Sequence, residues 1–169
     1  MSTSAAANSA TPAGVAPSGT PAALESGLRR VDHVGIAVPD MDSAITFYTN
    51  ILGMRLLHQE INTEQGVREA MLGFDDAGGS ATISATAIQL LAPLHEDSPI
   101  AQFLDSRGPG IHQLAYTVDN IVEASAKLKA KGLRLLYATP HRGTGGSLIN
   151  FVHPRDAGGV LIELVELIK

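Results

Sequence analysis

The 169-residue sequence predicts an α+β fold in which two tandem βαβββ modules form a curled mixed sheet around a cleft. Two observations lead to this prediction. Segments with an apolar period of two alternate with segments whose apolar period is about 3.6, which is typical of strands interspersed with helices. The second half of the chain also repeats the pattern of the first half, with similar residues 79 positions apart.

The first module begins with a strand-like run at 31–38. Asp40 or Asp42 can cap the helix that follows at 41–52, and Gly53 suits its end. Three extended segments come next, at 54–60, 66–74 and 85–93. Polar or glycine-rich stretches, which are typical of turns, separate them. We therefore expect module one to span about 31–93.

The second module follows a short helical linker near Ile100–Asp105. It has a strand at 111–118 and a helix at 119–132. Three strand-like segments complete it: 133–138, 147–152 and 159–167. We therefore expect module two to span about 110–166 and to share a single domain, 29–166, with module one.

The N-terminal segment 1–28 consists mainly of Ala, Ser, Thr, Pro and Gly, and we expect it to be a disordered tail. It has neither the basic start and apolar core of a secretory signal nor the arginines of a mitochondrial one before Arg29. These features lead us to expect a cytoplasmic location.

The composition restricts the chemistry and the partners of the protein. The formal net charge is −5, so the sequence shows no basic excess that would attract nucleic acid or an anionic membrane. No apolar stretch approaches the roughly 20 residues needed to span a bilayer. The chain has no cysteine, which excludes disulfides, thiolate metal ligands and thiol catalysis. A metal site would therefore use His, carboxylates and neutral oxygen donors.

The repeat predicts that His33 and His112 are equivalent. The same offset pairs other residues without a gap: Asp40 with Asp119, Gly53 with Gly132, and "GMRLL" at 53–57 with "GLRLL" at 132–136. If a pseudo-twofold axis relates the modules, the two histidines converge on the cleft.

The last strand of each module contains a lone polar residue, Gln89 in "AIQLLAP" and Glu163 in "VLIELVE". Such groups need partners when they are buried. A single strand histidine or glutamine is more often structural, but four polar residues at related places favour a metal site. With His33 and His112 they would give a divalent ion two imidazoles, an amide oxygen and a carboxylate, leaving two octahedral positions open.

Several motifs show a resemblance to a known family. They cover nearly all of 31–166: "DHVGIAV", "EQGVREAML", "IQLLAPL", "GIHQLAYTVDNI", "GTGGSLINFVHP" and "GVLIELVE". On these residues the chain resembles the vicinal-oxygen-chelate, or glyoxalase-like, superfamily, and within it the methylmalonyl-CoA epimerase family.

The resemblance implies a function and a set of site residues. One divalent metal ion per chain would be bound by His33, Gln89, His112 and Glu163, with cobalt implied and manganese, nickel, magnesium or zinc as alternatives. Glu69 and Glu163 would act as catalytic acid and base in a 1,1-proton transfer at C2 of methylmalonyl-CoA, through a metal-stabilised enolate. A homodimer is also implied.

The residues alone leave other possibilities open. Glu69 alternates with Val67 and Met71 and so points inward, but a structural salt bridge would also explain it. A glyoxalase-type isomerase would use the same fold and metal. An extradiol dioxygenase would use two histidines and one carboxylate on iron, and a non-catalytic binding protein of this fold would not need the metal set.

Overall fold

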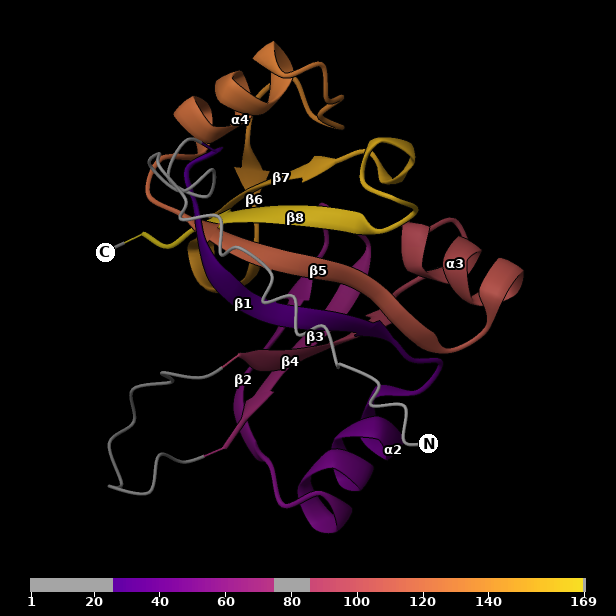
Figure 1. Cartoon of the computed structure of the whole chain (residues 1–169). Coiled ribbons are helices and arrows are strands. Elements are labelled where there is room, and N and C mark those ends of the chain that lie inside the picture. The colour runs from indigo at the N-terminus through magenta and orange to yellow at the C-terminus, as the bar shows by residue number, and fades with distance from the viewer. Residues whose placement is uncertain (1–25, 75–85, 169) are drawn as a thin grey trace, which may run out of the picture.

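The computed structural model describes residues 26–74 and 86–168, which form a mixed sheet of eight strands (Figure 1). The elements of the first module are β1 (Leu28–Ala37), α2 (Met41–Thr46) with a π-helical continuation (Phe47–Ile51), β2 (Arg55–Asn62), β3 (Val67–Gly73) and β4 (Ala87–Pro93). After the linking helix α3 (Pro99–Arg107) come β5 (Gly110–Val118), α4 (Ile121–Ala130), β6 (His141–Arg142), β7 (Leu148–Val152) and β8 (Leu161–Glu166), with 3₁₀ turns at Thr144–Gly146 and Pro154–Asp156. Residues 1–25 of the predicted tail lie outside the described residues, and Leu28 already belongs to β1.

The strand order β2-β3-β4-β1-β5-β8-β7-β6 joins the two modules at the centre of the sheet. β1 pairs in parallel with β4 of its own module, β5 pairs in parallel with β8, and β1 and β5 are antiparallel neighbours. The predicted α+β fold, with two βαβββ modules in a curled mixed sheet, is therefore confirmed.

Each module has its own helix over one face of the sheet, and α2 and α4 lie at opposite ends of the molecule (Figure 1). Leu90 of β4 belongs to the core beneath α2, and Leu164 of β8 belongs to the core beneath α4. Because successive side chains of a strand point to opposite faces, the neighbours Gln89 and Glu163 face the other way, toward the inner face. In the described part of the chain no helix is long and apolar enough to cross a membrane.

The repeat does not keep one offset along its whole length. The residues that cap α2 and α4, Asp40 and Asn120, are 80 positions apart. The glycines with positive φ that follow the helices, Gly53 and Gly132, are 79 positions apart. The difference is one residue, and a one-residue insertion is what a π-helical turn such as Phe47–Ile51 accommodates. The offset of 79 is therefore wrong for the strands that precede the helices, where the offset is 80.

The segment 133–138, predicted as a strand, makes only an isolated bridge from Leu135 to β7. Asn150 is the reason, because its side chain accepts the backbone N–H of Tyr137 at 3.2 Å and donates to the carbonyl of Tyr137 at 3.1 Å. A side chain thus satisfies backbone groups that a ladder would otherwise use. The strand of this region forms further along, as β6.

Candidate active site

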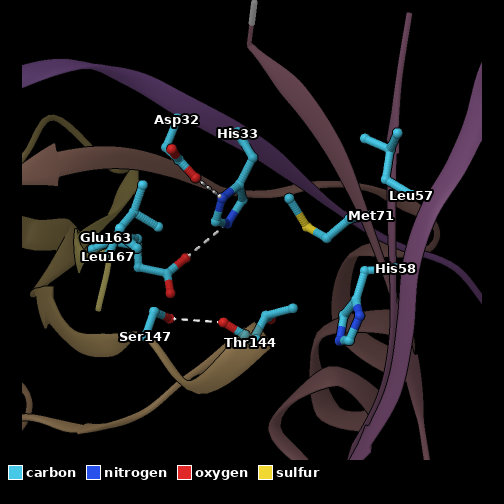
Figure 2. A pocket seen from close by; sticks show the side chains of 11 residues that line it. Asp32, His33, Leu57, His58, Met71, Thr144, Ser147, Glu163 and Leu167 are labelled. Atoms are coloured by element: carbon cyan, nitrogen blue, oxygen red, sulfur yellow. Dashed lines mark hydrogen bonds and ion pairs between the residues drawn. The ribbon is translucent and has the colours of Figure 1, made fainter. Parts of the chain in front are cut away.

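A cleft of about 280 Å³ opens on the inner face of the sheet (Figure 2). His33 from β1, Glu163 from β8 and Thr144 from a 3₁₀ turn contribute polar groups to its lining. Met71 and Val165 are among its apolar lining residues. The cleft therefore receives side chains from both modules.

His33 is 4% exposed and lies between two carboxylates, as Figure 2 shows. Its Nδ1 is 2.9 Å from Asp32 Oδ2, and its Nε2 is 3.1 Å from Glu163 Oε2. Burial lowers the pKa of His33, but the hydrogen bonds to Asp32 and Glu163 outweigh burial and raise that pKa to about 9. In the metal-free protein the ring is therefore an imidazolium at neutral pH, and it donates to both neighbours.

Glu163 is the buried carboxylate that the polar position in β8 predicts, at 4% exposure. Besides facing His33, it accepts a hydrogen bond of 2.5 Å from Gln113 Nε2. Gln113 Nε2 also lies 3.4 Å from Gln89 Oε1, and Gln89 Nε2 donates to Thr144 Oγ1 at 2.8 Å. These contacts join β4, β5 and β8 across the inner face of the sheet.

Glu69 on β3 is 2% exposed and lies behind Thr144. Thr144 Oγ1 donates to Glu69 Oε2, and Asn62 Nδ2 lies 3.5 Å from Glu69 Oε1. Burial raises the pKa of Glu69 and the charges of Glu60 and Glu163 add to this effect, whereas the hydrogen bonds from Thr144 and Asn62 oppose it. No salt bridge to Glu69 is found among residues 26–74 and 86–168, so its inward orientation has another cause.

The polar groups form one continuous chain of hydrogen bonds between the two carboxylates. Gln113 donates to Glu163 and to Gln89, Gln89 donates to Thr144, and Thr144 donates to Glu69. Both buried carboxylates thus have neutral donors, which reduces the cost of burying them.

His112 does not take the position predicted for it opposite His33. Its Nδ1 lies 2.7 Å from Gln113 Oε1, and its ring packs edge-to-face on Phe103 with centroids 4.9 Å apart. Burial lowers the pKa of His112. The structure therefore brings together His33, Gln89 and Glu163, and places Gln113 among them where the 79-residue register put His112.

The donor set also bears on metal binding. Within the described residues, no group of three or more His, Asp or Glu side chains is arranged to hold a metal ion. The reason is that two of the four converging side chains are amides, Gln89 and Gln113. Together with the His33 imidazole and the Glu163 carboxylate they still offer N and O donors that suit a divalent cation. These four residues fit a metal ion, and His112 as a metal ligand stays a prediction from the sequence.

Three residues of the site were not predicted from the sequence: Asp32, Gln113 and Thr144. Asp32 directly precedes His33, and a histidine that binds a metal commonly donates its other ring N–H to a carboxylate. Gln113 follows from pairing Asp40 with Asn120, the observed cap of the second helix, instead of with Asp119. Thr144 lies in "GTGG", which reads only as a turn.

The fold and the site agree with a known class of proteins. Residues 32–151 match the Glyoxalase/Bleomycin resistance protein/Dioxygenase superfamily, and the chain belongs to that superfamily. Its members need not share one activity, so the site and the individual relatives must indicate the chemistry.

Among the relatives are methylmalonyl-CoA epimerases, which confirms the resemblance seen in the motifs. The crystal structure of the Mycobacterium tuberculosis epimerase is 54% identical to this chain, with a TM-score of 0.76, and the match covers 85% of this chain and 91% of that one. An epimerase structure in complex with methylmalonyl-CoA and NH4+ is 43% identical, with a TM-score of 0.76 over 82% of this chain and 94% of that one. The mitochondrial methylmalonyl-CoA epimerase of Homo sapiens is 40% identical over 138 residues, which are 81% of this chain and 73% of the human protein.

Proposed function

We propose that this chain acts as a methylmalonyl-CoA epimerase, an isomerase that interconverts the (R) and (S) forms of its substrate by proton transfer at C2. The observation that carries the proposal is the pair of buried carboxylates, Glu69 from module one and Glu163 from module two, linked through neutral side chains in one site. A relative of known structure is in complex with methylmalonyl-CoA, and this supports methylmalonyl-CoA as the substrate.

The reaction explains why two carboxylates from different modules are needed. The hydrogen at C2 lies between a thioester carbonyl and a carboxylate, and its removal leaves an enolate beside an existing negative charge. Inversion requires that one group removes a proton from one face and another group delivers a proton to the opposite face. Glu69 and Glu163 are the two groups in this proposal, and they exchange roles with the direction of the reaction.

Glu69 is suited to proton transfer because of its surroundings. Burial raises its pKa above the ordinary value of a carboxyl group, which is the direction that proton transfer near neutral pH requires. Thr144 donates to one of its oxygens and lies between Glu69 and the cleft. The Thr144 hydroxyl therefore holds the Glu69 carboxylate in place and must release it, or pass on a proton, when Glu69 acts.

The proposal includes one divalent metal ion, which would be bound by His33, Gln89 and Glu163 together with a fourth donor from β5, either His112 as the sequence predicts or its neighbour Gln113. When bound, it supplies a Lewis acid that stabilises the charge developing on the thioester oxygen. Asp32 contributes by fixing the His33 ring through Nδ1, so that Nε2 points toward Glu163 and the cleft. Cobalt as the resident ion, the homodimer and the cytoplasmic location stay predictions from the sequence.

The test is deuterium exchange at C2. Purified protein loaded with a divalent metal is incubated with methylmalonyl-CoA in deuterated water, and we expect deuterium at C2 together with interconversion of the epimers. A Glu123→Gln variant, altered in an exposed carboxylate on α4, serves as the control for Glu69→Gln and should behave as wild type. Folded, metal-loaded wild-type protein that fails to exchange the proton would overturn the proposal.

The alternatives give different outcomes. A glyoxalase-type isomerase would turn over the thiohemiacetal of glutathione and methylglyoxal instead of methylmalonyl-CoA. An extradiol dioxygenase needs two histidines and a carboxylate on iron. In the described part of the chain only His33 contacts the Glu163 carboxylate, whereas His112 contacts Gln113. A binding protein would retain the acyl-CoA without exchanging its proton.

A further inference from the structure

The pairing of β1 with β5 fixes which residues of the two modules are equivalent. Val34 lies opposite Leu114 at the centre of the pairing. The neighbouring pairs are His33 with Ala115 and Gly35 with Gln113. A twofold axis through the Val34–Leu114 pair therefore exchanges His33 with Gln113, two residues that are 80 positions apart.

The last strands of the modules follow the same symmetry. In module one Gly35 pairs with Gln89, and in module two Ala115 pairs with Glu163. Gly35 and Ala115 are also 80 positions apart, so the axis makes Gln89 the counterpart of Glu163. Each module thus contributes two polar side chains at equivalent positions, and Gln113 is one of the four.

The residues that directly precede His33 and Gln113, Asp32 and His112, are also equivalent. Asp32 and His112 are 80 positions apart, and each lies where the β1–β5 register shifts by one residue. Asp32 Oδ2 lies 2.9 Å from His33 Nδ1, and His112 Nδ1 lies 2.7 Å from Gln113 Oε1. His112 is therefore the counterpart of Asp32, and each of the two orients the side chain that follows it.

The space around Gln113 supports this arrangement. Gln113 is 5% exposed, and its amide lies among Gln89, Glu163 and His112. A Cβ added to Gly35 would lie 2.5 Å from Gln113 Cγ. The glycine thus provides the room through which the Gln113 side chain reaches the inner face.

We infer that Gln113, and not His112, is the side chain that module two presents to the metal ion, with His112 as the positioning residue behind it. The inference rests on the proposed metal-dependent function. Gln113 would turn its oxygen to the ion and its NH2 group to His112, whose neutral ring can accept at Nδ1. The donor set is then one imidazole, two amide oxygens and one carboxylate.

This set predicts a different metal preference from a site with two imidazoles. Imidazole favours late first-row ions such as Co²⁺, Ni²⁺ and Zn²⁺, whereas carboxylate and carbonyl oxygens suit Mg²⁺ and Mn²⁺. Replacing one imidazole by an amide oxygen therefore lowers the affinity for Co²⁺ more than the affinity for Mg²⁺. Gln113→His should reverse this shift.

The first test is a calorimetric titration of metal-free protein with Co²⁺ and with Mg²⁺, in the absence of substrate. We expect Gln113→His to raise the Co²⁺ affinity by about tenfold or more and to change the Mg²⁺ affinity by less. The matched variant His112→Gln should change either affinity by less than about tenfold, because a glutamine can still hydrogen-bond the Gln113 amide. A loss of about a hundredfold in His112→Gln, with Gln113→His unchanged, would overturn the inference.

The second test counts imidazoles directly, by X-ray absorption on Co²⁺-loaded protein. We expect one imidazole in the wild type, one in His112→Gln and two in Gln113→His. Two imidazoles in the wild type, falling to one in His112→Gln, would overturn the inference, as would no Co²⁺ binding by wild type and Gln113→His alike. The absorption measurement needs no substrate, so it is independent of the deuterium-exchange assay. If His112 binds the metal and the exchange assay succeeds, only this inference is wrong. If Gln113 binds the metal and the exchange assay fails, only the proposed function is wrong.

Discussion

Replacing Gly35 by alanine should displace Gln113 and leave the rest of the fold in place. The added Cβ would lie 2.5 Å from Gln113 Cγ and 3.0 Å from its Cδ. Ordinary carbon–carbon contacts lie at roughly 3.5–4.0 Å, so the Gln113 side chain has to retreat by about 1 Å. Gly35 is not among the glycines with positive φ, and alanine can adopt its backbone conformation. The effect is therefore steric.

The displacement has an expected size. Gln113 would lose its 2.5 Å hydrogen bond to Glu163, and a buried carboxylate that loses a donor costs about 1–3 kcal/mol. Metal affinity should fall by about 10–100-fold, the usual effect of disturbing a group near a bound ion. Urea unfolding and calorimetric titration of Gly35→Ala measure the two quantities.

The matched control is Gly110→Ala on β5, because no atom lies within 4 Å of a Cβ added there. Its stability should stay within about 0.5 kcal/mol of wild type. Gln113→Ala removes the atoms that the new methyl group would meet, so Gly35→Ala should cost much less in that background. A loss of stability in Gly35→Ala that is equally large in the wild-type and in the Gln113→Ala background would show that the added methyl group does not act through the Gln113 side chain.

Three further predictions concern the carboxylates and the histidine. Glu69→Gln should lower turnover by about 10²–10⁴-fold while metal affinity stays unchanged, and a parallel loss of metal would show that Glu69 is misassigned. Thr144→Val removes a hydrogen bond that lowers the pKa of Glu69, so the pH profile of kcat/KM should move to higher pH; an unmoved profile would contradict the contact. Because the pKa of His33 is raised from 6.5 to about 9, its protonation stabilises the metal-free fold fully below pH 6.5, and this contribution is lost as the pH rises through 9. The urea midpoint should fall over that window in wild type and less in His33→Gln, and equal falls would count against the assignment.

The sequence predicted the architecture well because periodicity and repetition are local signals. Except for β6, the strands and the helices of both modules follow from alternation, caps and glycines such as Gly53 and Gly132. The burial of Gln89 and Glu163 follows from their places in apolar strands.

One residue in a helix explains why the observed register of the repeat differs from the predicted one. The π-helical turn Phe47–Ile51 adds one residue to module one, and the amino-acid sequence of that segment does not distinguish it from an α-helix. Counting back from the glycines therefore placed His112 opposite His33, whereas counting back from the observed caps, Asp40 and Asn120, reaches Gln113.

The other misses depend on contacts between distant parts of the chain. Thr144 meets Glu69 and Gln89 only because the 3₁₀ turn folds over the cleft from the other module. The segment 133–138 fails to become a regular strand because the side chain of Asn150 takes the backbone groups of Tyr137. Neither contact has a spacing or composition that a single sequence reveals.

The most direct test of the two-carboxylate mechanism follows one stereochemically pure epimer of methylmalonyl-CoA in deuterated water by NMR, with metal-loaded protein. The mechanism predicts that the opposite epimer appears with deuterium at C2, and that either starting epimer gives the same final mixture. In Glu69→Gln this conversion should nearly vanish, while Glu123→Gln retains it. Appearance of the opposite epimer with its original hydrogen at C2, or full activity of Glu69→Gln, would contradict the two-carboxylate mechanism.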